Sequence, residues 1–191
     1  PVSQDHINHY FSTHILVNDI IPSGRFFGWT DRIGTGYPFG DLYGTTCYLF
    51  TGLLHLISFG LIELDVSYAF GIVLVWLIPA LAVTAWACRL GGPMSAVAAG
   101  MLFVLDMGAD REGGWVYAMF HGVWPQQLGA GIWLFSLLSL FRLAEKMTTR
   151  RLSVAVILMG LSLWVHPMNT VVLALSGLLL FSPFFITYRT T

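Results

Sequence analysis

Long uncharged segments separated by short polar stretches fill most of the chain after residue 66. The cleanest of them, residues 67–88, ends at Arg89, and Gly91-Gly92-Pro93 then predicts a tight turn. Further apolar segments follow at residues 94–105, 124–141, 152–165 and 168–186. About 20 apolar residues cross a hydrocarbon core of about 30 Å. The pattern therefore predicts about five membrane-spanning helices within residues 67–191.

The apolar segment 42–62 needs a different interpretation, because basic residues decide how the spans are oriented. Lys and Arg collect at the cytoplasmic ends of spans. If residues 67–88 run inward and later segments alternate, six basic residues lie inside, namely Arg89, Arg142, Lys146, Arg150, Arg151 and Arg189. Three lie outside, namely Arg25, Arg32 and Arg111. An additional span at 42–62 would invert this distribution, so we predict a helix that lies on or dips into the outer face.

Residues 1–66 are predicted to form an external region that carries juxtamembrane helices. Residues 1–41 make a long polar loop rich in aromatic side chains, which we expect to fold against the membrane surface. The predicted fold class is all-α, a polytopic transmembrane helical bundle with a long external first loop. Because the chain starts at Pro1 without an initiator Met, we also expect a fragment of a longer membrane protein.

The composition agrees with this prediction and argues against several other classes of protein. Of 191 residues, 56% are apolar and 10% are charged, whereas an ordinary soluble domain has about 25% charged residues. A soluble enzyme or a disordered tail does not fit this balance. A net charge of −1 gives no basic surface for nucleic acid. We expect an integral protein of the plasma (cytoplasmic) membrane whose long loop faces outside.

The last two apolar segments predict a hollow at the outer face. As one helix, residues 152–186 would be about 52 Å long, which is too long for one span and short for two with an exposed connection. We therefore expect two helices to meet at His166-Pro167, below the outer surface. Polar groups at that depth need water or protein partners, and a wet, outward-facing depression would supply both.

The first candidate site lies at the start of the chain. On a helix, Asp5 and His9 are four residues apart and His6 and His9 are three apart, so each pair shares a face. The cluster fits a carboxylate base beside an imidazole, a Zn²⁺ site or a polar helix start. Asp41 closes the polar loop and fits either an acidic site residue or the N-cap of the following helix.

Two more candidate sites lie further along the chain. The helix expected to start at Pro125 would begin at the outer face, where free N–H groups bind anions. Arg111, His121 and Gln126 are candidate donors beside it, and the alternative is a solvated loop with interfacial tryptophans. His166 fits either a substrate contact or a packing residue at the helix joint.

These motifs occur in an order that resembles a known group of proteins. An Asp-His pair starts a long external loop, Gly-Tyr-Pro and Asp41 lead into an apolar surface helix, and a Pro-Gln helix start and a His-Pro joint follow. This order resembles the GT-C superfamily of membrane glycosyltransferases. The resemblance is greatest to the family labelled 6-pyruvoyl-tetrahydropterin-synthase-related membrane proteins.

The resemblance implies an enzyme that moves a sugar from a polyprenyl-phosphate donor to a hydroxyl of a glycan or lipid acceptor on the outer face. It implies Asp5 as the catalytic base and Asp41 as a second acidic residue. The candidate substrate-binding residues in this hypothesis are His6, His9, Arg25, Arg111, His121, Gln126 and His166. No cofactor is required, although a divalent metal is compatible. Family members have a helix before the first loop and a further C-terminal part, so we expect this chain alone to be inactive.

Two other functions are compatible with the sequence. A transporter or flippase for a lipid-linked or anionic solute would share the sunken helix joints and the polar residues at depth. A structural assembly subunit with inert polar loops is the third interpretation. A transferase consumes its donor in detergent, whereas a transporter needs a sealed membrane.

Overall fold

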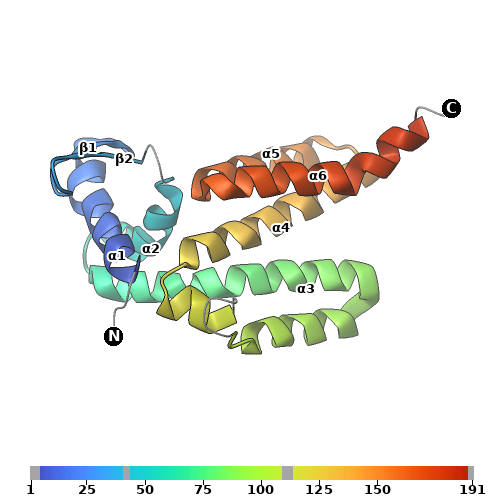
Figure 1. The fold of residues 1–191 in the computed structure, drawn as a ribbon, viewed down its shortest axis with the longest axis horizontal. Coiled ribbons are helices and arrows are strands. Elements are labelled where there is room, and N and C mark those ends of the chain that lie inside the picture. Colours follow the sequence, from blue (N-terminus) through green and yellow to red (C-terminus); the bar gives the residue numbers. More distant parts are fainter. Residues whose placement is uncertain (1–4, 41–43, 109–113, 189–191) are drawn as a thin grey trace.

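Helices form most of the chain in the computed structural model, which describes residues 5–40, 44–108 and 114–188 (Figure 1). The helices are α1 (Asp5–Ile15), α2 (Thr46–Ile57), α3 (Leu64–Leu105), α4 (Trp124–Glu145), α5 (Thr149–Val165) and α6 (Pro167–Tyr188). Two strands, β1 (Gly28–Thr30) and β2 (Tyr37–Phe39), form an antiparallel hairpin. Apart from this hairpin, the structure is helical, as predicted.

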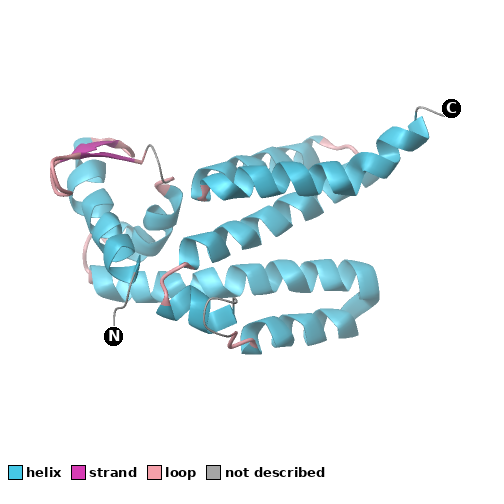
Figure 2. Ribbon diagram, viewed as in Figure 1, coloured by secondary structure: helices cyan, strands magenta, loops and turns pink. Residues whose placement is uncertain are grey.

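The N-terminal region is built of regular elements and not of an irregular loop (Figure 2). α1 continues into a π-helical turn at Leu16–Ile20 and a 3₁₀ turn at Ile21–Ser23. In the hairpin, Gly36 has a φ of +111°, and a Cβ there would lie 2.2 Å from the Trp29 indole. Glycine alone therefore lets this ring cover the turn. Sequence analysis predicted a folded region but not the strands.

The tight turn predicted at Gly91-Gly92-Pro93 is confirmed, because it bends α3 into two arms. Gly92 has a φ of 79° and a ψ of −173°, which is not helical, and Pro93 starts the second arm. The first arm is about 40 Å long and the second, which ends at Leu105, is about 20 Å long. The second arm alone is too short to cross a hydrocarbon core of about 30 Å.

A helix is present in the segment predicted to lie on the outer face, and the predicted joint at His166-Pro167 exists. α2 is about 18 Å long, so it is too short to cross a membrane. Its N-cap is Thr45, so the prediction that Asp41 caps this helix is wrong; Asp41 itself lies outside the described residues. α5 ends at Val165 with His166 as its C-cap, and α6 starts at Pro167.

Two helices of the described chain, α3 and α4, are long and apolar enough to cross a membrane. In the most apolar part of each helix, 44% of the residues of α3 and 39% of those of α4 are buried. The core helix of a soluble protein is mostly buried instead. Large apolar side chains also face outward from the other helices, such as Trp164 and Leu179, which are 64% and 76% exposed. This surface indicates membrane association, whereas a bundle of about five spans stays a prediction.

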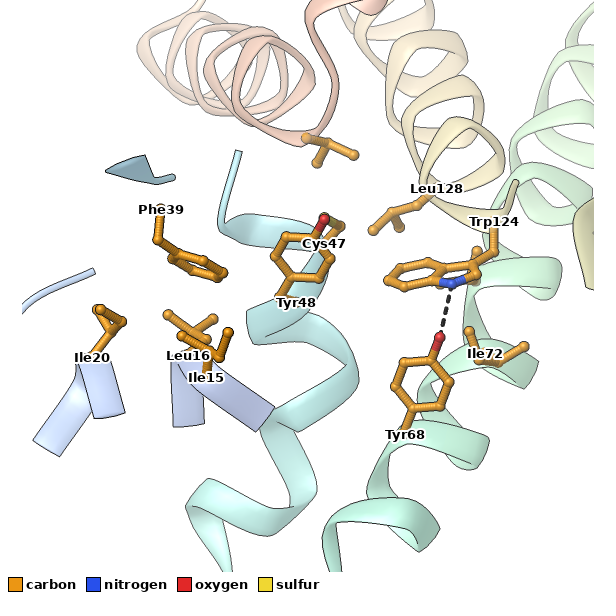
Figure 3. Packing of buried hydrophobic residues seen from close by; sticks show 12 residues of the cluster. Ile15, Leu16, Ile20, Phe39, Cys47, Tyr48, Tyr68, Ile72, Trp124 and Leu128 are labelled. Atoms are coloured by element: carbon orange, nitrogen blue, oxygen red, sulfur yellow. Dashed lines mark hydrogen bonds between the residues drawn. The ribbon is translucent and has the colours of Figure 1, made fainter. Parts of the chain in front are cut away.

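One apolar core joins the N-terminal region to the long helices (Figure 3). Leu16 of the π-helical turn, Phe39 of β2, Tyr48 of α2, Tyr68 of α3 and Trp124 of α4 all belong to it. The core is thus continuous across the boundary predicted after residue 66. It fixes α1 against the ends of the long helices, where the candidate site lies.

Candidate functional site

α1, the hairpin and α2 enclose a polar cavity of about 590 Å³ at one end of the molecule. Its lining includes a carboxylate, an imidazole, a guanidinium and two phenols, from Asp5, His9, Arg32, Tyr37 and Tyr48. Asp5 and His9 are in consecutive turns of α1, so the face predicted to hold both does hold both. We call this space the polar cavity.

His9 is the most constrained polar group of the polar cavity. Its Nδ1 lies 3.3 Å from the Tyr48 hydroxyl, and its ring meets the Trp124 indole edge to face at 5.3 Å between centroids. Burial lowers the pKa of His9 to about 4, although the nearby charge of Asp5 acts to raise it. The imidazole is therefore neutral near pH 7 and acts as a hydrogen-bonding group there.

This low pKa predicts that stability falls in acid. The folded protein binds a proton at His9 less readily than the unfolded chain, whose histidine has a pKa of about 6.5. Stability should therefore be constant above about pH 6.5 and fall as the pH drops toward 4, by up to about 3 kcal/mol. Thermal unfolding in detergent at pH 7 and pH 4.5 measures this. The His9→Gln variant should lose less stability over that interval, and an equal loss in both proteins would contradict the assignment.

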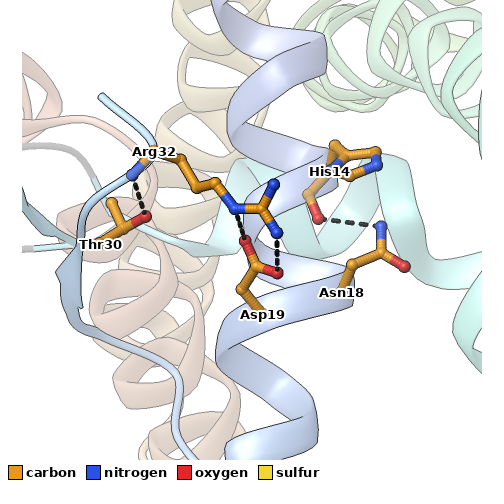
Figure 4. A network of polar contacts seen from close by, with 5 residues as sticks. All are labelled: His14, Asn18, Asp19, Thr30 and Arg32. Carbon is orange, nitrogen blue, oxygen red and sulfur yellow. Dashed lines mark hydrogen bonds and ion pairs between the residues drawn. The ribbon is translucent and has the colours of Figure 1, made fainter. Parts of the chain in front are cut away.

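Arg32 is the cation of the polar cavity, and sequence analysis did not select it as a site residue. Its guanidinium pairs with the Asp19 carboxylate, with the Nε–Oδ2 and Nη2–Oδ1 distances both 3.3 Å (Figure 4). The backbone N–H of Arg32 donates to the Thr30 hydroxyl at 3.3 Å. The side chain is 63% exposed, so its outer edge is open to an anion. Only the hairpin, which was not predicted, places Arg32 opposite α1.

His6 lies on another side of α1 and lines an apolar groove of about 780 Å³. We call this the apolar groove; its walls come from α1, α3 and the turn before α4, including Ile7, Tyr10, Phe11, Tyr68, Ile72 and Met119. Phe11 lines both the groove and the polar cavity. The two spaces therefore share Phe11 as part of their walls.

His6 also links α1 to the core through a chain of hydrogen bonds. Its Nε2 contacts the Met119 carbonyl, so this nitrogen carries the hydrogen and Nδ1 is the acceptor. Nδ1 lies 3.1 Å from the Tyr68 hydroxyl, which accepts from Trp124 Nε1 at 3.1 Å. These bonds fix the imidazole, so the structure explains His6 as a positioning group for α1.

The other two predicted histidines lie close to α1 but do not line the polar cavity. His121 is buried and packs against the rings of Tyr117 and Phe120. The next residue, Gly122, has a φ of +78°, and a Cβ there would lie 2.6 Å from the backbone nitrogen of His6. The turn before α4 therefore needs glycine to approach the start of α1.

His166 at the joint of α5 and α6 is buried, and its Nδ1 accepts from the Met168 N–H at 3.3 Å. Burial is the main cause of the low pKa of His9, and the electrostatic effect of His166 acts in the same direction. The joint thus lies near the polar cavity, but His166 does not line that cavity, in contrast to the hollow predicted at the joint. This end of α5 also contacts the loop before α2, since the Trp164 carbonyl occupies the space that a Cβ on Gly44 would need.

Several predicted site residues are not part of this arrangement. The Arg25 side chain donates from Nε to the Ser23 hydroxyl at 3.0 Å and lines a separate, smaller cavity of about 310 Å³. Gln126 is exposed and lines neither the polar cavity nor the apolar groove. Asp41 and Arg111 lie outside the described residues.

The structure argues against one of the two interpretations of the α4 start, an open, anion-binding N-terminus. Trp124 at its start is fully buried and Pro125 is buried too. The Gln126 N–H already donates to the Val123 carbonyl at 3.1 Å. Pro125 made the helix start visible in the sequence, but the burial of this start against α1 depends on tertiary packing.

Comparison of the chain with protein-family models, with curated proteins and with solved structures gives no match. The function is therefore argued from the geometry of the site. Within residues 5–40, 44–108 and 114–188, no group of three or more His, Cys, Asp or Glu side chains is placed to hold a metal ion. The site's chemistry is that of a carboxylate, a neutral imidazole and a cation beside an apolar surface.

Proposed function

We propose that this chain belongs to an integral membrane glycosyltransferase that moves a sugar from a polyprenyl-phosphate donor to an acceptor hydroxyl. The observation that carries the proposal is that Phe11 of α1 lines both the polar cavity and the apolar groove. A lipid-linked sugar has both parts, a polar sugar phosphate and an apolar chain. The groove, next to α3, would hold the first part of the prenyl chain and the cavity would hold the sugar.

The Asp5 carboxylate is the proposed general base. It takes the proton of the acceptor hydroxyl while that oxygen bonds to the anomeric carbon, and the bond from that carbon to the phosphate oxygen breaks. The lipid phosphate leaves with the electron pair of the broken bond and therefore gains negative charge. Arg32, on the opposite wall of the polar cavity, would stabilise that charge. His9 and Tyr48 would orient hydroxyls of the sugar or the acceptor.

The proposed reaction takes place on the outer face of the plasma membrane. The polar cavity lies at the end of the molecule that carries α1 and the hairpin, whereas Arg142, Lys146, Arg150 and Arg151 lie at the other end of α4 and at the start of α5 (Figure 1). Basic residues mark the cytoplasmic ends of spans. This distribution supports the predicted orientation.

The proposal is tested by turnover without a sealed membrane. The intact protein, purified in detergent, should release polyprenyl phosphate from a radiolabelled polyprenyl-phosphate sugar and pass the label to an acceptor. Reconstitution of the same protein in sealed vesicles distinguishes the transferase from a flippase. A flippase would move the donor between leaflets and leave its sugar–phosphate bond intact. Movement without bond cleavage would refute the transferase.

A further inference from the structure

A second polar cavity, of about 660 Å³, is lined by the end of α4 and the start of α5. These helix ends lie at the opposite end of the molecule from α1 and the hairpin (Figure 1). The cavity lies between these helix ends and α3. Its lining contains four cations, Arg142, Lys146, Arg150 and Arg151, with the hydroxyls of Ser139 and Thr148. We call it the basic pocket. The proposed transfer reaction does not use it.

Among the residues that the structure describes, no carboxylate lines the basic pocket. The nearest acidic residue in sequence, Glu145, pairs instead with Arg89, whose guanidinium also lies 5.4 Å from the centre of the Phe141 ring. Arg151 donates to the backbone carbonyls of Arg142 and Lys146 and so holds the connection between the helices. The positive charge of the pocket is therefore not neutralised by the described chain, and it attracts an anion.

Helix stabilisation explains only part of this charge. Arg142 is in the last turn of α4, where the helix dipole favours a cation. Arg150 and Arg151 are in the first turn of α5, where the dipole disfavours one. The helix dipole therefore does not account for Arg150 and Arg151, which line the same pocket as Arg142 and Lys146. Such a group of cations can bind a phosphate through charge-assisted hydrogen bonds.

The remaining wall of the basic pocket is apolar and comes from Phe135, Leu138, Val154 and Leu158. α4, which supplies part of this wall, is one of the two helices able to cross a membrane. A phosphate in this position would thus lie beside surface suited to acyl chains. We propose that the basic pocket binds the phosphate headgroup of an anionic membrane phospholipid, at the face of the membrane opposite the transfer site.

Native mass spectrometry of the intact protein in a nonionic detergent tests this proposal, with phosphatidylglycerol as the probe. Each cation near a lipid surface contributes about 1 kcal/mol, so the Arg142→Gln/Arg150→Gln variant should bind phosphatidylglycerol about 25-fold more weakly. The Arg25→Gln variant is the control, since it loses a positive charge at the other end, outside the polar cavity, and should bind normally. Arg142→Lys/Arg150→Lys should keep most of the affinity.

Three results would overturn the proposal. Equal binding of phosphatidylglycerol by the Arg142→Gln/Arg150→Gln and Arg25→Gln variants would place the lipid elsewhere. Equal binding of phosphatidylcholine would remove the role of the negative charge. Displacement of the lipid by millimolar inorganic phosphate would show that the pocket takes free phosphate and not a lipid. Thermal unfolding of each variant, expected to match the parent because these side chains are exposed, shows that a loss of binding is not a loss of fold.

Discussion

Replacement of Asp5 by asparagine is expected to lower the rate of sugar transfer by at least about 100-fold, because general-base catalysis contributes about 10²–10⁴-fold. The substitution keeps the size of the side chain and removes its ability to accept a proton. Binding of the donor should change much less, since the cavity wall and Arg32 remain. The measurement is a single-turnover assay of the intact protein with a polyprenyl-phosphate sugar.

Asp31→Asn is the matched control for this experiment. Asp31 is a carboxylate of the same N-terminal region that lines neither the polar cavity nor the apolar groove. Its side chain accepts from Trp29 Nε1 at 2.7 Å, and an asparagine oxygen can still accept that bond. Transfer should therefore continue at nearly the parent rate in Asp31→Asn. Undiminished transfer by Asp5→Asn would remove Asp5 from the catalytic role.

Replacement of Trp124 by alanine is expected to lower the free energy of unfolding by about 3–5 kcal/mol. The indole is fully buried, packs against His9 and Tyr68 from two other helices, and donates to the Tyr68 hydroxyl. Its loss leaves a cavity where α1, α3 and α4 meet. Thermal unfolding in detergent measures the change, and the His9 imidazole should lose its low pKa as water enters.

Two further variants separate the causes of this loss. Trp124→Phe keeps much of the buried apolar surface but removes the N–H. The missing hydrogen bond should lower the free energy of unfolding by about 1 kcal/mol, and the smaller ring should add a packing defect. Trp164→Ala removes an indole that is 64% exposed on α5 and should change stability much less than Trp124→Ala. Equal effects of Trp124→Ala and Trp164→Ala would contradict the core described here.

The helices were predictable because each signal is local in the sequence. Glycine before proline at Gly92 ends a helix arm, and His166-Pro167 breaks the last apolar stretch, because proline removes a backbone donor and restricts the preceding residue. The hairpin was not predictable, since its strands are three residues each and carry too little alternation to reveal a period of two. The start of α2 was placed too early because Asp41 is a strong N-cap type, whereas the structure uses Thr45.

The candidate site was predictable only in part, for a similar reason. Asp5 and His9 share a helix face, and helical spacing alone brings them together. Arg32 reaches the same cavity through a hairpin that no local signal predicted, and Arg25 was equally plausible from the sequence. The start of α4 is buried, and the His6 side chain lines the apolar groove. Both features depend on how α1 packs against α3 and α4. Such contacts join residues more than 60 positions apart.

The central claim is that the lipid-linked sugar binds beside α1, with its chain in the apolar groove and its sugar in the polar cavity. Photocrosslinking tests this directly. A polyprenyl-phosphate sugar with a diazirine in the first isoprene unit is irradiated with the intact protein, and the labelled peptides are identified by mass spectrometry. We predict labels on the α1 and α3 walls of the groove, at positions such as Ile7 and Ile72, that unlabelled donor prevents. Labels confined to α5 and α6, or labels that excess donor does not reduce, would contradict this account.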